Sequence, residues 1–275
     1  MSKTNYEVFQ SKDEFIEFYK NNDYFKNREI YINDALKYIK EKGIWCEFNR
    51  EQALPHNIII SSENYRETIQ YKAFNSRQRA VNHEVLKIVN KIDENSIRIY
   101  APEAVTKYAL AYRGRFPKYL GSEYTEDSQQ KRQLFPIPIE DLHKLSFNGE
   151  SFDLVIASEV FEHIPFLDKA LSELARILSV GGQLIATFPF RAGADESLVK
   201  AIIKDGKIDY LLEPEYHGNP VDKNGSLVYE IPGWNILDRA KMAGFSEAKM
   251  IWHYSQQSGI LARDMVGVFV FISAK

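Results

Sequence analysis

The feature that most constrains the fold is a strand–helix–strand unit within residues 152–188. It opens with FDLVIA, a continuous apolar run of the kind expected for a strand that is buried on both faces. The next apolar residues recur three and four positions apart, which places them on one face of a helix: Leu167, Ala170, Leu171, Leu174, Ile177 and Leu178. We expect Gly181 and Gly182 to end this helix with a left-handed turn, and residues 184–188 to form the next strand. This order is typical of a parallel sheet covered by helices on both faces.

The same alternation of strands and helices extends from residue 96 towards the end of the chain. In chain order we expect a strand at 97–100, a helix at 104–115, a strand at 118–123, a helix at 233–242 and closing strands at 248–254 and 266–273. The two closing strands are expected to pair antiparallel at one edge. The sequence therefore predicts an α/β fold of Rossmann-like type, with a doubly wound, mostly parallel sheet of seven strands that includes an antiparallel edge strand.

Residues 1–92 are expected to form a mainly helical N-terminal extension, and residues 93–275 the sheet domain. A helix is expected over 76–92, with Arg77 and Arg79 on its polar face. These two side chains could contact an anionic group of a substrate, or they could belong to a solvated basic face. The insertion 190–232 shows neither helical nor strand periodicity, and loops of that length are commonly functional or disordered.

Charge and cysteine content exclude several classes of protein. The chain has 35 basic and 38 acidic residues and a formal net charge of -3, so it has no general excess of positive charge to attract nucleic acid or anionic membrane. The single cysteine, Cys46, excludes internal disulfides and zinc sites built from several cysteines. No run approaches the roughly 18 apolar residues of a membrane span. We therefore expect a cytoplasmic protein that acts on a small molecule, without nucleic acid or membrane insertion.

Ligands of an open parallel sheet collect beyond the carboxyl ends of its strands. Glu123 is expected at the end of the second strand, where an ionised carboxylate can accept hydrogen bonds from both ribose hydroxyls of a nucleoside. Asp141, with the backbone of Leu142, is a second position that could recognise an adenine edge. Both acids have simpler interpretations, because Glu123 could be an ordinary surface acid and the pair Glu140-Asp141 could belong to a solvated turn.

Residues 146–190 carry a resemblance to a known family; they read SFNGESFDLVIASEVFEHIPFLDKALSELARILSVGGQLIATFPF. This stretch resembles class I S-adenosylmethionine-dependent methyltransferases, in which a strand of the form FDLV is followed by a short Glu-His-hydrophobic motif. The later segments YHGNP, GSLVYEIPGW and RAKMAGF look like a bacterial branch that is often found with surface-polysaccharide genes. The resemblance implies S-adenosylmethionine as cofactor.

Residue roles follow from this resemblance. Glu123 would bind the ribose of the cofactor, with Tyr124 beside it, and Asp141 with Leu142 would bind adenine. Ser158 and Glu159 would lie beside the methionine portion of the cofactor and the substrate.

The chain departs from the family at the loop after the first strand. There the family has an acidic residue and Gly-x-Gly, whereas this chain reads Tyr100-Ala101-Pro102-Glu103-Ala104. Ala101 and Pro102 restrict the backbone conformations that glycine allows. We still expect Tyr100 and Ala101 near the cofactor. Glu103 would meet the cofactor's ammonium group, or would be a charge at the start of the next helix.

Methyl transfer from a sulfonium mainly requires that the acceptor be positioned, and a base helps where the acceptor is a hydroxyl. His163 and His217 are the candidate bases, and Glu159 is a candidate for contact with the acceptor. Each histidine could instead have a purely structural or substrate-contacting role. Glu159, Glu162 and His163 could alternatively hold a divalent ion, although we expect no metal.

The favoured interpretation is an enzyme that methylates a small molecule or sugar at oxygen. The alternative is a binding or scaffold protein that keeps the fold but has lost the cofactor. A nicotinamide dehydrogenase is disfavoured because no Gly-x-Gly-x-x-Gly follows any strand.

Overall fold

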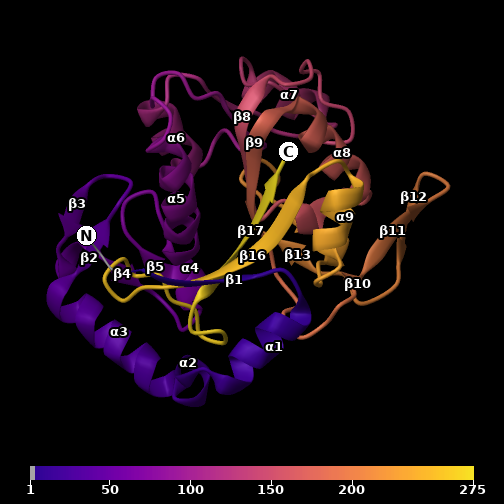
Figure 1. Ribbon diagram of the computed structural model, residues 1–275. Helices are drawn as coiled ribbons and strands as arrows, with labels where there is room; N and C mark the ends of the chain where they lie inside the picture. The colour runs from indigo at the N-terminus through magenta and orange to yellow at the C-terminus, as the bar shows by residue number, and fades with distance from the viewer. Residues whose placement is uncertain (1–3) are drawn as a thin grey trace. The chain divides into compact units, whose positions relative to one another are not determined.

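The computed structural model describes residues 4–275 (Figure 1). Its main sheet has seven strands in the order β1-β16-β17-β9-β8-β6-β7. These strands are β1 (Asn5–Phe9), β6 (Ile99–Ala101), β7 (Tyr119–Gly121), β8 (Phe152–Ser158), β9 (Leu178–Thr187), β16 (Glu247–Tyr254) and β17 (Val268–Ala274). Strand β6 runs parallel to β7 and β8, β8 runs parallel to β9, and the edge strand β1 is antiparallel to β16. The Rossmann-like α/β fold with a mostly parallel seven-stranded sheet and an antiparallel edge strand is therefore confirmed.

The antiparallel edge strand comes from an unexpected part of the chain. It is β1, which lies in the segment that was expected to be a mainly helical extension. The expected closing strands do form, as β16 and β17, and they are neighbours in the sheet rather than its edge.

The chain forms two compact units. One comprises Asp93–Ala248 with Ile272–Lys275, and the other comprises the chain up to Ile92 with Lys249–Phe271. Among residues 4–275, no helix combines the length and the apolar character needed to cross a bilayer.

Helices of the first of these units are α6 (Lys107–Arg115), α7 (Ser128–Leu134), the 3-10 helix η2 (Phe161–His163), α8 (Leu167–Ile177) and α9 (Ile236–Met242). The apolar stripe predicted for α8 is buried, and α8 packs against α9. The glycine pair does not end α8, contrary to expectation: the capping residue is Leu178, in an extended conformation, and β9 starts there. Gly181, at φ +78°, instead lies in an irregular part of β9, where the register with β8 shifts between Phe152 and Leu154.

Between β7 and β8 the structure has no full strand. Glu123 forms an isolated parallel bridge with Ile139, in which Glu123 N donates to Pro138 O at 3.0 Å and Glu140 N donates to Glu123 O at 3.0 Å. The connection from Glu123 to Asp141 thus contains the short helix α7 and this bridge, in place of a full strand.

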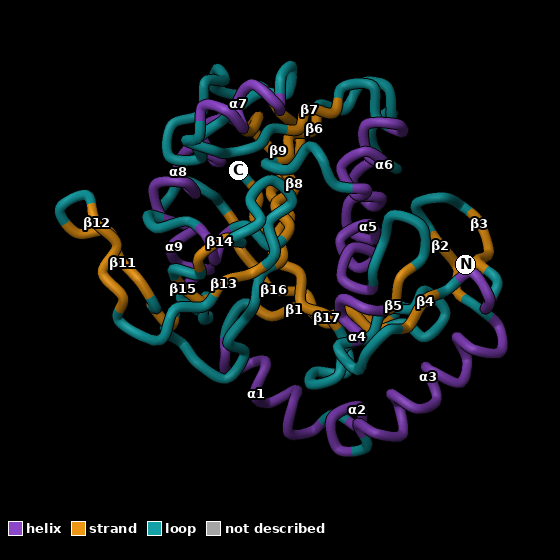
Figure 2. The backbone as a smooth tube through the Cα atoms, turned by 180° about the vertical axis from the view of Figure 1, so that it is seen from behind, coloured by secondary structure: helices purple, strands orange, loops and turns teal. Residues whose placement is uncertain are grey.

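The insertion 190–232 is more regular than its sequence indicates, and Figure 2 shows it as short strands joined by long loops. It contains three antiparallel pairs: β10 (Leu198–Val199) with β15 (Glu230–Ile231), β11 (Ala201–Lys204) with β12 (Lys207–Tyr210), and β13 (Tyr216–His217) with β14 (Ser226–Leu227). The β11–β12 hairpin projects away from α8 and α9 (Figure 1). Arg239 of α9 joins the insertion to α8, because its guanidinium donates to Asp168 at 2.6 Å and to Glu230 at 2.8 Å.

Among the described residues, the second unit contains the remaining helices and four short strands outside the main sheet. They are α1 (Lys12–Asn21), α2 (Asp23–Lys26), α3 (Arg28–Lys42), η1 (Pro55–Asn57), α4 (Tyr65–Thr68), α5 (Ser76–Val89), β2 (Ile44–Cys46), β3 (Glu51–Ala53), β4 (Ile59–Ile60) and β5 (Ile69–Gln70). Aromatic side chains form much of its core, with Phe15 packed edge-on against Phe9 and Phe269 at centroid distances of 5.6 and 5.3 Å.

The basic face expected on α5 is not solvated at its two arginines. Arg79 is only 4% exposed, and its guanidinium donates to four backbone carbonyls at 2.6–3.0 Å, those of Ile69, Phe74, Ser258 and Gly259. Arg77 is also buried and donates to both carboxylate oxygens of Glu67. Both side chains therefore hold the unit together, and Arg79 has its donors committed to the backbone rather than to an anionic substrate.

Candidate active site

The loops after β6 and β7 are tied together by Glu123. Its Oε1 accepts hydrogen bonds from the backbone N–H groups of Ala104 at 2.8 Å and Val105 at 3.0 Å. Burial raises the pKa of Glu123, whereas the two backbone donors act in the opposite direction. The acid expected to bind a ribose thus lies at the end of β7 as predicted, with one carboxylate oxygen already holding the neighbouring loop.

A glycine does assist this loop, but it lies on the adjacent strand. A Cβ added to Gly121 in β7 would lie 2.5 Å from Glu103 O and 3.0 Å from Ala104 Cα. Tyr119 Oη donates to the same Glu103 carbonyl at 2.8 Å. The segment that lacks Gly-x-Gly is therefore held close to β7 by Gly121, Tyr119 and Glu123 together.

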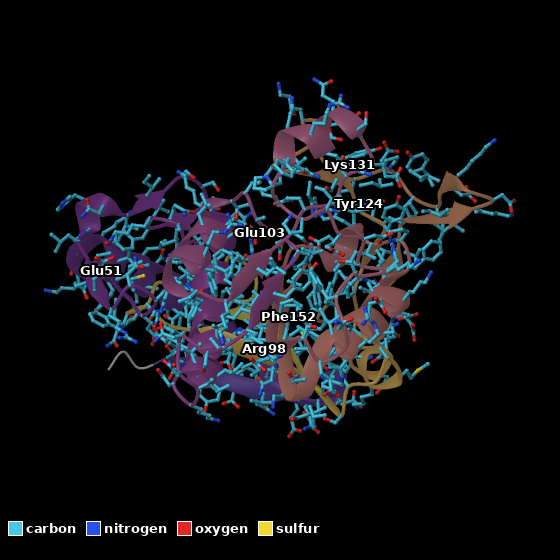
Figure 3. All side chains as sticks on the ribbon, turned by 90° about the horizontal axis from the view of Figure 1, so that it is seen from above. Glu51, Arg98, Glu103, Tyr124, Lys131 and Phe152 are labelled. Carbon is cyan, nitrogen blue, oxygen red and sulfur yellow. The ribbon has the colours of Figure 1, made fainter. Side chains whose placement is uncertain are left out.

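The other residues expected around the cofactor differ in burial and in their hydrogen-bond partners. Tyr100 is fully buried, and its hydroxyl lies 2.9 Å from Ser122 Oγ, while Ala101 is also buried within β6. The Glu103 carboxylate accepts a hydrogen bond from Thr106, the N-cap of α6. Tyr124 is 54% exposed and its hydroxyl donates to Glu126 at 2.9 Å. Figure 3 labels Glu103 and Tyr124, which come from the loops that follow β6 and β7.

The pair Glu140-Asp141 divides into a structural acid and a more accessible one. Glu140 is buried, and its carboxylate accepts hydrogen bonds from both the N–H and the hydroxyl of Ser146. The Asp141 side chain is 46% exposed. Its Oδ1 accepts a hydrogen bond from the backbone N–H of His143 at 2.9 Å and lies 2.8 Å from His143 Nδ1. Leu142, which follows it, is largely buried. Asp141 therefore keeps carboxylate surface for a ligand, as its predicted role requires.

The carboxyl end of β8 carries two unusual residues. Ser158 Oγ is buried and has no hydrogen-bond partner among the described residues. Glu159, which follows it, has φ +54°, a left-handed conformation that costs free energy for a residue with a Cβ. A hydrogen bond from Glu159 N to Thr187 O, at 2.7 Å, holds this turn. Strained backbone and an unpaired hydroxyl at a strand end are features of a ligand-binding position.

Immediately after this turn, the structure brings three side chains together around the Glu162 carboxylate. Glu162 is fully buried, and neither of its carboxylate oxygens has a hydrogen-bond partner among residues 4–275. His163 Nε2 lies 3.7 Å and His217 Nδ1 lies 3.6 Å from the same oxygen, Oε1, and the two imidazole rings meet edge to face. These separations are longer than hydrogen bonds. We call these three residues the 162–163–217 cluster.

The insertion supplies the groups that orient the two histidines. Leu227 O in β14 accepts a hydrogen bond from His163 Nδ1 at 2.8 Å, and Glu215 Oε1 accepts one from His217 Nε2 at 3.1 Å. The pKa of His217 is raised to about 9 by the Glu162 carboxylate and, to a smaller extent, by the Glu215 carboxylate. Tyr229 N donates to Glu162 O at 2.7 Å, which fixes the insertion to η2. Sequence reasoning selected both histidines but not Glu162 as their common neighbour, because this contact depends on how the insertion folds.

Comparison with protein families gives a match to part of the chain. Residues 115–186 match the family described as "Methyltransferase domain". The match supports the enzyme class predicted from the resemblance, an S-adenosylmethionine-dependent methyltransferase, and S-adenosylmethionine as the cofactor of that class. Comparison with curated proteins gives no match.

Similar solved structures are distant in sequence. An S-adenosylmethionine-dependent methyltransferase from Mesorhizobium loti is 16% identical, with 72% of this chain and 97% of that chain covered and a TM-score of 0.44. The 1,6-didemethyltoxoflavin-N1-methyltransferase of Burkholderia thailandensis, with bound S-adenosylhomocysteine, is 11% identical, with coverage of 71% and 78% and a TM-score of 0.38. A putative sarcosine dimethylglycine methyltransferase from Galdieria sulphuraria is 16% identical, with a TM-score of 0.33. That match covers 40% of this chain and 47% of that chain, so this chain spans about half the length of that protein.

The residues at the strand ends are compatible with an S-adenosyl ligand. Ser158 offers an unpaired buried hydroxyl beside β8, and Asp141 offers an accessible carboxylate. At β7, Glu123 Oε1 is bonded to two backbone donors, so ribose hydroxyls would rely on the other oxygen of the same carboxylate.

Proposed function

We propose that this protein transfers the methyl group of S-adenosylmethionine to a hydroxyl oxygen of a small molecule or sugar. The observation that carries the proposal is the 162–163–217 cluster, which begins four residues after the end of β8 and beside the strained Glu159. Ligands of open parallel sheets collect at this kind of strand end. Two histidines and a buried carboxylate are suited to handling the proton of a hydroxyl acceptor.

Glu123 binds the ribose hydroxyls in this proposal, and Asp141 with the Leu142 backbone binds the adenine. Tyr124 lies beside the nucleoside. Tyr100 and Ala101 form the floor beneath the loop at the end of β6, where Glu103 faces the ammonium group of the methionine portion.

Ser158 and Glu159 lie beside the reacting methyl group and the acceptor. The bound cofactor supplies a methyl group already activated by its sulfonium. During transfer an oxygen lone pair forms the O–CH3 bond, the S–CH3 bond breaks, and its electron pair stays on sulfur. The acceptor's proton passes to His163, or to His217 at a pH near or above its pKa of about 9, and Glu159 contacts the acceptor hydroxyl.

The acceptor class and the location are also proposals. A sugar acceptor, and hence a part in polysaccharide biosynthesis, is supported by the resemblance of YHGNP and GSLVYEIPGW to a bacterial branch found with surface-polysaccharide genes. The net charge of -3 favours a small-molecule acceptor over nucleic acid, and the single cysteine suits the cytoplasm.

A test combines a panel of hydroxylated acceptors with a measurement of S-adenosylhomocysteine release. We expect release that depends on the acceptor, with mass spectrometry placing the new methyl on oxygen. His163→Gln and His217→Gln should lower kcat by about 100-fold or more, whereas His56→Gln, at an exposed histidine, should not. Normal turnover in both cluster variants would exclude the histidines as bases.

The second candidate is a non-catalytic binding or scaffold protein. It is favoured by one observation, the use of Glu123 Oε1 by the backbone of Ala104 and Val105. Millimolar or absent affinity for S-adenosylmethionine and S-adenosylhomocysteine in calorimetry would support the scaffold and contradict the enzyme.

A further inference from the structure

We infer that Glu162, His163 and His217 bind one divalent transition-metal cation. The first observation is the state of the Glu162 carboxylate, which is fully buried with neither oxygen hydrogen-bonded among the described residues. A buried carboxylate without partners is costly, and a cation is the natural compensation. The surrounding groups are two imidazoles placed too far from it for hydrogen bonds.

The spacing of the cluster suits a shared central ion. One potential ligand atom from each residue lies within 4.8 Å of the others, and Glu162 Oε1 is 3.6 and 3.7 Å from the two ring nitrogens. Ligands bound to zinc at about 2.1 Å in a tetrahedral arrangement are roughly 3.4 Å apart. The three atoms therefore need only small shifts to coordinate one ion.

The outward nitrogens of both rings are already fixed. His163 Nδ1 donates to Leu227 O, which leaves Nε2 as the nitrogen that faces Glu162. His217 Nε2 faces Glu215, which leaves Nδ1 towards Glu162. Metal-binding histidines are characteristically oriented in this way, by a backbone carbonyl or a carboxylate on the second nitrogen. Two imidazoles and one carboxylate favour Zn²⁺, Fe²⁺ or Co²⁺ over Mg²⁺ or Ca²⁺.

A second group of similar residues, His83, Glu84 and His253, provides a contrast. There Lys87 Nζ lies 2.7 Å from Glu84 Oε1, so an ammonium already compensates the carboxylate. Among residues 4–275 Glu162 has no such lysine or arginine. The groups that can carry positive charge beside it are the imidazoles of His163 and His217, at 3.7 and 3.6 Å, and a bound cation would displace the proton that they share with it. The cation is therefore assigned to the 162–163–217 cluster.

This inference deepens the proposed function. The binding of the cation does not depend on that function, but the chemical role given to the cation rests on it. Three protein ligands leave positions for one or two oxygens of the acceptor. A hydroxyl bound to the cation loses its proton more readily, and the proton passes to solvent. With the ion bound, the two histidines act as ligands, and this path to solvent replaces their role as bases in the proposed function. The acceptor is then expected to be a hydroxyl or a vicinal diol.

Metal binding is tested without cofactor or acceptor. Tag-free protein is first stripped of metal with a chelator. It is then titrated with Co²⁺, with binding measured by visible absorption, and separately with Zn²⁺, with binding measured by calorimetry. We expect one equivalent to bind, with the d–d bands of a nitrogen- and oxygen-ligated Co²⁺. Glu162→Gln, His163→Gln and His217→Gln should each weaken binding by more than about 100-fold.

Two controls locate the ion: His83→Gln in the second group and the exposed His56→Gln should bind normally. Absence of stoichiometric binding to the wild type, loss of binding only in His83→Gln, or unchanged binding in the cluster variants would each overturn the inference. Should the cluster variants fail to fold, the wild-type titration and His83→Gln still decide. Methyl transfer is assayed separately with stripped and reloaded protein, so a metal-binding protein without transferase activity would contradict the proposed function alone.

Discussion

Single residues show what holds the segment that follows β6. Glu123 accepts two backbone N–H groups from the segment after β6, and Gly121 leaves space for that segment to approach β7. One carboxylate is thereby given two tasks, to hold the loop and, in our proposal, to accept the ribose hydroxyls.

Glu123→Gln separates these two tasks. The amide oxygen can still accept from Ala104 and Val105, but the NH2 group cannot accept from ribose. We expect the melting temperature to change little and the Kd for S-adenosylhomocysteine to rise by about 10-fold or more, since a hydrogen bond to a charged group contributes roughly 1.5–3 kcal/mol. Calorimetry beside an exposed-site control, Glu41→Gln, measures this. Unchanged affinity would remove Glu123 from the cofactor site.

Arg79 has a structural role, because its guanidinium donates hydrogen bonds to backbone carbonyls within one unit. Lysine cannot reproduce that planar fork, so Arg79→Lys leaves buried carbonyls unpaired. We expect a loss of about 3 kcal/mol or more, or roughly 6–12 °C in melting temperature. Arg113→Lys, at an exposed arginine of α6, should leave the melting temperature within about 2 °C. Equal melting temperatures for the two variants would contradict the structural role of Arg79.

At the scale of elements, the β13–β14 pair determines whether the cluster forms, because it carries His217 and Leu227. Gly225 just before β14 has φ +80°, and a Cβ there would lie 2.4 Å from His217 O. Gly206 in the β11–β12 turn has φ +72° but no atom within 4 Å of its Cβ position.

Gly225→Ala and Gly206→Ala are therefore a matched pair. Both substitutions impose left-handed strain of about 1–2 kcal/mol, but only the first collides with the backbone of His217. We expect Gly225→Ala to lose Co²⁺ binding and methyl transfer, and Gly206→Ala to keep both. If both variants bind and turn over alike, the positioning of His217 by this strand pair is not needed.

The contact between α8 and the loop that precedes β8 should respond to acid. Arg176 donates to both carboxylate oxygens of Glu173, which also accepts from Leu145 N at 2.9 Å. The Arg176 hydrogen bonds lower the pKa of Glu173 from its usual 4.5, so the ionised carboxylate contributes stability above pH 4.5. That contribution is lost as the pH falls through the lowered pKa.

Thermal melts of wild type and Glu173→Gln between pH 3 and pH 7 test whether the stabilisation by Glu173 decreases as the pH falls. Above pH 4.5 we expect the wild type to be more stable by up to about 1 kcal/mol, with the difference shrinking below that pH. An advantage that grows as the pH falls would contradict the assignment.

At the scale of the whole molecule, the sequence predicts what depends on local periodicity. FDLVIA and the α8 stripe specify a buried strand and an amphipathic helix, and Glu123 follows from its place after a strand. Edge strand β1 and the environment of Arg79 could not be predicted, because they depend on pairing between distant segments. The same is true of His217, whose neighbour Glu162 is determined by the fold of the insertion.

The central claim is that an S-adenosyl ligand binds at the strand ends of β6, β7 and β8 without a glycine-rich loop. Calorimetric titration of tag-free wild-type protein with S-adenosylhomocysteine tests it most directly. We predict binding of one equivalent with a Kd in the micromolar range, about −8 kcal/mol. Absence of binding at millimolar ligand, by a protein with a normal thermal melt, would contradict the account.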